Sequence, residues 1–176
     1  CDGVGILFYA AVSNENKVVV DLLAELKRDF EGEEYSRRLD SRVRKEGYVA
    51  LGISGEASTL ATAMMTASPE VVFMLLQNGA NVESVDVMGN DGFMLASAFG
   101  RPKNLQCWLE RVKDWDLSRQ NTVFGGCALG NAVYMGANKL ETVKVLLDAG
   151  ASLDFRTFSG GNVLTNVSSN EDSDPD

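Results

Sequence analysis

The sequence predicts an all-α fold, a solenoid of helix-turn-helix repeats connected by β-hairpins or loops. The clearest unit, residues 58–83, contains two short segments whose apolar side chains recur with the i, i+3, i+4 spacing of one helical face. Between these segments, residues 68–70 (Ser-Pro-Glu) provide a capping hydroxyl, a proline for the first helical position and an acid for the first turn. Gly79 follows where a left-handed C-terminal cap is needed. Ala96 lies 33 residues after Ala63, so the unit recurs and the fold is a repeat array.

This unit resembles the ankyrin repeat, whose pattern is a Thr-Pro-Leu-His-x-Ala start, a Glu-Val-Val turn and a Leu-Leu then Gly-Ala finish at a period of about 33 residues. The Pro and His of the start are replaced by Thr59 and Ala61, so this copy is degenerate. The resemblance implies stacked helical hairpins with an extended concave recognition surface. The residues that match in register, without a gap, are Ser58, Leu60, Ala63, Glu70, Val71, Val72, Leu75, Leu76, Gly79 and Ala80.

We predict one array over residues 1–176. In its first repeat, Leu7 and Ala10 take the start positions, and Leu22 and Leu23 take the leucine pair. Residues 1–4 have the character of a hairpin end. The predicted repeats are 1–26, 53–83, 86–117, 120–153 and an incomplete 154–176, with a charged helical insertion at 27–52.

The insertion places 20 residues beyond the repeat period between the first two repeats, and it is rich in charge of both signs. Within it, Tyr35, Leu39 and Val43 recur every four residues, which predicts an amphipathic helix over 33–45. Its basic side chains could form a groove for phosphate or RNA, or simply a solvated helix face. The second interpretation is favoured because acids alternate with the bases and no aromatic residues are interleaved. The basic residues are Arg37, Arg38, Arg42, Arg44 and Lys45.

The later repeats keep the register with local changes in length. The third has about two residues too many at 111–117, which a longer outer helix or an irregular loop must absorb. The fourth has a two-residue insertion at 135–139, which widens the turn between its helices. The fifth carries Leu164 and Val167 on its inner helix and stops where an outer helix should begin. We therefore expect the chain to be an excerpt of a longer array.

Composition argues against several functional classes. The chain has a formal charge of −9 and no apolar run near the ~18 residues of a membrane span, which disfavours nucleic acid and membranes as partners. It has no histidine, the usual activating base and commonest zinc ligand, so we expect no enzymatic activity, metal or cofactor. The three cysteines form no close metal-ligand pair and no disulfide framework, which suggests a reducing intracellular compartment such as the cytoplasm.

Three motifs have a chemical and a structural interpretation, and the structural one is favoured each time. Residues 125–130 lack the Lys-Ser/Thr ending of a phosphate-binding loop, and in repeat register they are a hairpin end running into an inner helix. Cys127 would lie near a helix N-terminus, where a thiol becomes more acidic, but without histidine it is better explained as a packed small residue. The acidic stretch 171–176 lacks the ligand spacing of a calcium loop.

The ankyrin resemblance implies that partners contact the hairpin tips and the ends of the inner helices. Most residues there are aromatic, Met or Val, which is unusual for exposed positions and typical of the core of an interface. We therefore predict an apolar groove for a protein or peptide partner on a monomeric chain. The alternative is that a shifted register, or the insertion folding over the groove, buries these side chains. The predicted partner-binding residues are Met65, Val87, Met88, Phe99, Val123, Phe124, Tyr134, Met135 and Phe158.

Two functions are compatible with this pattern. The first is a non-catalytic protein-interaction scaffold. The second is a regulatory or targeting segment of a larger enzyme or channel. Only sequence on either side of these 176 residues would separate them.

Overall fold

A computed structural model describes residues 5–47, 52–135 and 138–162. Within these ranges the secondary structure is helical, and the helices are joined by turns and by two isolated antiparallel bridges. Residues 1–4, residues 136–137 of the predicted insertion at 135–139, and the predicted fifth inner helix with Leu164 and Val167 lie outside the described residues. The helices are α1 (Ile6–Val12), α2 (Asn16–Asp29), α3 (Gly32–Leu39), α4 (Thr59–Thr66), α5 (Pro69–Gln77), α6 (Gly92–Ala98), α7 (Pro102–Arg111), α8 (Ala128–Met135) and α9 (Lys139–Asp148).

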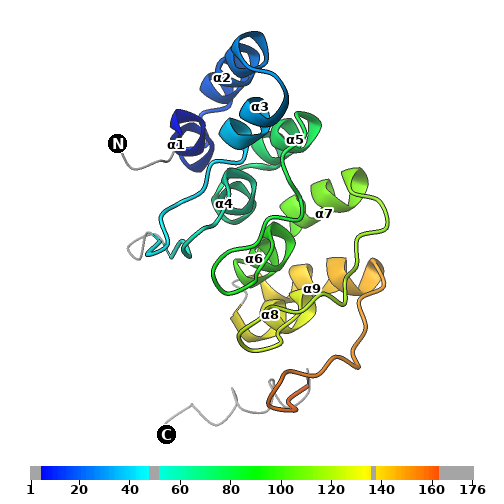
Figure 1. Cartoon of the computed structure of the whole chain (residues 1–176). Coiled ribbons are helices and arrows are strands. Elements are labelled where there is room, and N and C mark those ends of the chain that lie inside the picture. The colour runs from blue at the N-terminus through cyan, green and yellow to red at the C-terminus, as the bar shows by residue number, and fades with distance from the viewer. Residues whose placement is uncertain (1–4, 48–51, 136–137, 163–176) are drawn as a thin grey trace, which may run out of the picture.

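The helices stack as antiparallel pairs in two layers (Figure 1). An inner layer consists of α1, α4, α6 and α8, each in contact with the next, and an outer layer consists of α2, α5, α7 and α9. The connections between pairs project on the side of the inner layer. This arrangement confirms the predicted all-α solenoid. The face formed by the inner layer and the connecting hairpins is called the inner face below.

The core fills the space between the two layers. The recurring alanines Ala63, Ala96 and Ala132 are completely buried, which lets neighbouring inner helices approach closely. Leu75 and Trp108 of the outer layer belong to the same buried cluster. The repeat register taken from these alanines therefore coincides with the packing between helices, although the residue limits of each repeat stay a prediction.

Local signals explain where the helices begin and end. Pro69 occupies the first turn of α5, as predicted, and Gly79 after α5 has a left-handed φ of +85°. Ser68 lies at the predicted cap position, but its hydroxyl makes no capping hydrogen bond. Side-chain caps occur instead on two inner helices. The Ser58 Oγ accepts from the Ala61 N–H at 3.2 Å, and the Asp91 Oδ1 accepts from the Met94 N–H at 2.8 Å.

The insertion differs from the prediction in one respect. Its helix, α3, ends at Leu39 instead of continuing to residue 45. The prediction failed because residues after α3 pair with a distant segment: Arg42 forms an antiparallel bridge with Ser58, and the Val43 N–H donates to the Ala57 carbonyl at 3.1 Å. Residues 42–47 and 52–58 are therefore the described arms of one long hairpin, called the long hairpin below. Val43 is buried in this hairpin and not on a helix.

The extra residues at 111–117 form an irregular loop, since α7 ends at Arg111. Trp115 of this loop packs edge-on against Trp108, with ring centroids 5.0 Å apart, and also contacts Phe93 of α6. The sequence left open a longer outer helix or an irregular loop, and the structure has the loop. An aromatic cluster anchors it to both layers.

Candidate protein-binding surface

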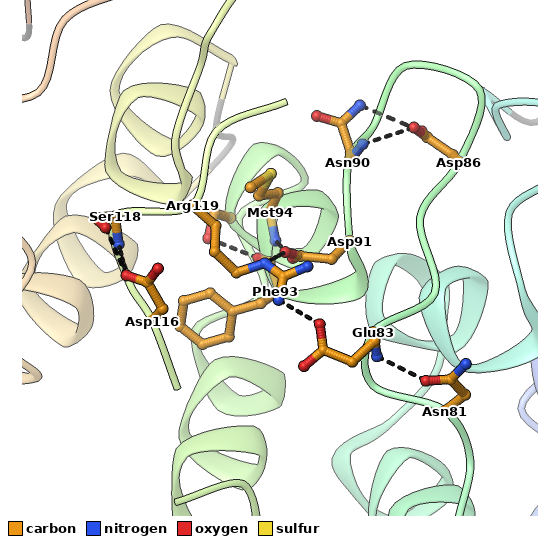
Figure 2. Close-up of polar contacts among 11 residues, drawn as sticks. Asn81, Glu83, Asp86, Asn90, Asp91, Phe93, Met94, Asp116, Ser118 and Arg119 are labelled. Atoms are coloured by element: carbon orange, nitrogen blue, oxygen red, sulfur yellow. Dashed lines mark hydrogen bonds and ion pairs between the residues drawn. The ribbon is translucent and has the colours of Figure 1, made fainter. Parts of the chain in front are cut away.

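Two hairpins of the inner face are held in shape by an Asp or Asn side chain at their base. The Asp86 Oδ1 accepts from the backbone N–H of Met88 at 2.9 Å. It also accepts from the backbone N–H of Asn90 at 2.8 Å (Figure 2). In the next hairpin the Asn121 Oδ1 accepts from the N–H groups of Phe124 and Gly125. Such side-chain bonds satisfy the turn's donors locally. They fix the backbone that carries the predicted contact residues.

Successive hairpins are also bonded to one another. The backbone N–H groups of Val87, Thr122 and Phe158 donate across to carbonyls of the preceding hairpin at 2.9 to 3.0 Å. Gly125 has a left-handed φ of +70°, and a Cβ there would lie 2.7 Å from the Phe158 ring. Glycine is required at this close approach. The hairpin tips therefore form a connected row instead of independent loops.

Several predicted contact residues of the later hairpins and inner helices are exposed. The exposed fractions are 59% for Phe124, 58% for Tyr134, 62% for Met135 and 66% for Phe158. Aromatic and Met side chains of this size are seldom left so exposed without a reason. Val87, Phe99 and Val123 are also exposed, and Met88 is half-buried. We call this set the open surface: Val87, Phe99, Val123, Phe124, Tyr134, Met135 and Phe158.

Met65, by contrast, is not available to a partner. Only 3% of it is exposed, because it belongs to a second buried cluster on the inner face. The long hairpin contributes Val43, Ile53 and Ala57 to this cluster, and the inner helices contribute the remainder. Folding of the insertion over the groove, the alternative considered from the sequence, therefore applies to this part of the face. The inner-helix members are Phe8 of α1, Ala61 and Met65 of α4, and Leu95 of α6.

No protein-family model matches the chain. The crystal structure of the ankyrin repeat domain of Bcl-3, a member of the IkappaB protein family, superposes with a TM-score of 0.76 at 25% sequence identity, over 97% of this chain and 68% of that one. The chain therefore has the ankyrin-repeat fold.

The sequence of the chain is also similar to part of the phosphocholine transferase AnkX of Legionella pneumophila. It is 30% identical over 111 residues, which is 62% of this chain and 11% of AnkX. The chain thus spans about a tenth of the length of that relative. The transferase activity in its name belongs to AnkX as a whole.

A charged cluster beneath the ankyrin hairpins has no counterpart in the sequence-based prediction. Arg119 forms ion pairs with Glu83 and, at 3.2 Å from its Nε, with the Oδ2 of Asp91 (Figure 2). Its guanidinium also lies over the Trp115 ring. Burial raises the pKa of the Asp91 carboxyl, against the opposing effects of the Met94 N–H and Arg119. The cluster joins the loop after α5, the start of α6 and the loop after α7. Arg119 lies 28 residues after Asp91 and 36 residues after Glu83, so no local sequence pattern predicts that they meet.

Three basic residues of the insertion, Arg37, Arg38 and Arg42, are engaged in contacts within the chain. Arg37 and Arg38 pair with Glu34 on the same helix, and Arg42 donates to the carbonyls of Glu56 and Val85. These contacts favour the solvated-face interpretation over a nucleic-acid groove. In the part of the chain that the structure describes, no helix is long and apolar enough to cross a membrane.

The remaining candidate sites have structural roles in the array. Cys127 is buried in the core, where burial raises the pKa of its thiol, and this is opposite to the activation that a nucleophile needs. Burial likewise raises the pKa of Cys107. Residues 125–130 are the end of a hairpin and the start of α8. Within the hairpin, the Asn121 N–H donates to the Gly126 carbonyl at 2.9 Å.

Proposed function

We propose that this ankyrin array is a non-catalytic interaction scaffold that binds a protein or peptide through the open surface. The observation that supports it most directly is the exposure of Phe124, Tyr134, Met135 and Phe158 on hairpins and a helix fixed by hydrogen bonds. Fully burying one such side chain contributes about 1.5 to 3 kcal/mol. A rigid frame lowers the ordering cost of binding, so more of this energy is retained as affinity.

Further features support a scaffold without chemistry. The sequence has no histidine, and the buried carboxylates Asp86 and Asp91 are committed to capping backbone N–H groups. The described cysteines, Cys107 and Cys127, are free thiols, which is compatible with a reducing, intracellular location. We propose a monomer that engages its partner through the open surface.

A second proposal is that the array is the regulatory or targeting segment of a larger enzyme. The similarity to AnkX motivates it, because there the matched stretch is 11% of a protein named for a transferase activity. The test is to delete residues 52–162 from the full-length protein and assay it. Loss of partner binding with unchanged activity of any attached domain would favour the pure scaffold.

The test of the scaffold is a binding experiment with matched variants. Partners are captured from cell lysate, identified and purified, and their dissociation constants are measured for the wild type and for Phe124→Ser/Tyr134→Ser. We expect affinity to fall at least about tenfold, since aromatic anchors commonly contribute more than 1 kcal/mol each. The matched control is Val20→Ser/Leu140→Ser, which removes two exposed apolar side chains from the outer layer. Equal affinity of both variants would disprove binding through the open surface.

A further inference from the structure

The open surface is uncharged although the chain is strongly acidic. Residues 87–90, 92–100, 120–135 and 157–162 contain no Asp, Glu, Lys or Arg, in a chain with a formal charge of −9. Asp86 and Asp91, the two acids that flank residues 87–90, are buried and accept backbone hydrogen bonds. The seven side chains of the open surface therefore carry no charge themselves, and the exposed Arg156, two residues before Phe158, donates to the Gly160 carbonyl.

The covered part of the inner face shows which kind of side chain this surface accepts. The long hairpin buries Val43, Ile53 and Ala57 against the inner helices. Its charged residues Arg42 and Glu56, each next to a buried one, stay exposed. The hairpin thus presents alternate side chains to the inner face, the pattern of an extended segment. Its described residues in this buried cluster, Val43, Ile53 and Ala57, are aliphatic.

The covered and open parts are continuous. Leu95 of α6 is buried by the long hairpin, and Phe99, one turn further along, lies beside its Gly52. From Phe99 the face continues through α8, which packs against α6, to Tyr134 and Met135. The Met88 carbonyl accepts from the Thr122 N–H, so the hairpin row continues as well. The open surface extends the same face beyond the end of the long hairpin.

We propose that the open surface binds an uncharged segment of a partner protein that presents aliphatic and aromatic side chains, as the long hairpin does on the covered part. This inference rests on the proposed function and specifies the chemistry of the partner. A basic segment, which the charge of −9 would attract in general, is not the occupant. Affinity then comes from apolar burial and depends little on ionic strength.

The test selects from a phage library of random 12-residue peptides. Selection is run in parallel on the wild type, on Phe124→Ser/Tyr134→Ser and on the outer-layer control Val20→Ser/Leu140→Ser, with folding of each checked by circular dichroism. We expect the wild type and the control to enrich peptides rich in Leu, Ile, Val, Phe and Trp and poor in charge. The Phe124→Ser/Tyr134→Ser variant should not enrich them.

One enriched peptide is then synthesised with a fluorophore, and its dissociation constant is measured by fluorescence polarisation at 50 and 500 mM NaCl. We expect a change of less than about twofold, because few ion pairs are screened. Lys/Arg-rich peptides that need Phe124 and Tyr134, or a tenfold or larger weakening in salt, would overturn the inference and leave the scaffold intact. Equal enrichment by the wild type and the Phe124→Ser/Tyr134→Ser variant would instead count against the scaffold itself.

Discussion

The two ends of the inner face differ although they are built from the same repeat. At the N-terminal end the long hairpin covers α1, α4 and part of α6, so that Met65 is buried. At the C-terminal end the equivalent residue of α8, Tyr134, is exposed, as are its neighbours. The difference shows that position in a repeat does not decide whether a residue is free to bind. Here the long hairpin buries Met65, and the hairpin before α8 leaves Tyr134 exposed.

The largest expected effect is on stability and compares these two equivalent residues. Met65 and Tyr134 each lie two positions after a completely buried alanine of an inner helix. Met65→Ala leaves a cavity under the long hairpin and should lower the free energy of unfolding by ~2 to 5 kcal/mol. Tyr134→Ala should change it by no more than ~0.5 kcal/mol, as is usual at exposed sites. Urea denaturation measures both.

The converse result would break the comparison. If Tyr134→Ala destabilised the chain as much as Met65→Ala, the open surface would be part of the core, and its apolar residues would need no partner. Phe8→Ala, also beneath the long hairpin, provides an internal check and should cost ~3 to 5 kcal/mol.

A smaller effect is expected at the base of the long hairpin. The Arg42 Nη1 donates to the carbonyls of Glu56, at 3.1 Å, and Val85, at 2.8 Å, and so ties this hairpin to the next. Arg42→Gln should lower the free energy of unfolding by about 1 kcal/mol and speed hydrogen exchange at the Val43 amide, which bonds to Ala57. Arg37→Gln, which affects only an exposed pair within α3, is the control. Equal exchange at Val43 in both variants would exclude a role for Arg42 in covering the inner face.

Much of the solenoid followed from the sequence because it depends on local patterns. The four-residue apolar spacing, the proline of α5 and the left-handed Gly79 each act within one helix, and the alanine period carries the register from one pair to the next. The length of the helix predicted over 33–45 was overestimated for the same reason, since α3 ends at Leu39. Val43 continues the spacing of Tyr35 and Leu39, and nothing local reveals that it pairs with Ala57.

Features that depend on contacts between repeats were not predictable in this way. Burial of Met65 requires Ile53 and Val43, which come from a hairpin of unusual length. The Arg119 cluster requires Glu83 and Asp91, which lie in other connections. Of the predicted site, Met65 is buried beneath the long hairpin, whereas Phe124, Tyr134, Met135 and Phe158 are exposed. Partner binding by them stays a prediction.

The smallest expected effect concerns α6, the helix on which the covered and open parts meet. Burial raises the pKa of the Asp91 carboxyl in the folded chain above its ordinary value of about 3.9. The folded state therefore binds the Asp91 proton more tightly than the unfolded state. The contribution of Asp91 to the free energy of unfolding thus rises as the pH falls through the folded pKa towards the unfolded one. Asp91→Asn removes the titration but keeps a side chain that can cap the helix.

The difference in unfolding free energy between the wild type and Asp91→Asn isolates this contribution from the other carboxylates. It should shift in favour of the wild type as the pH falls from 7 towards 4, and it should be constant well above the folded pKa. Urea denaturation at several pH values measures it. A shift in the opposite direction would mean that the Arg119 ion pair and the Met94 N–H outweigh burial at the Asp91 carboxyl.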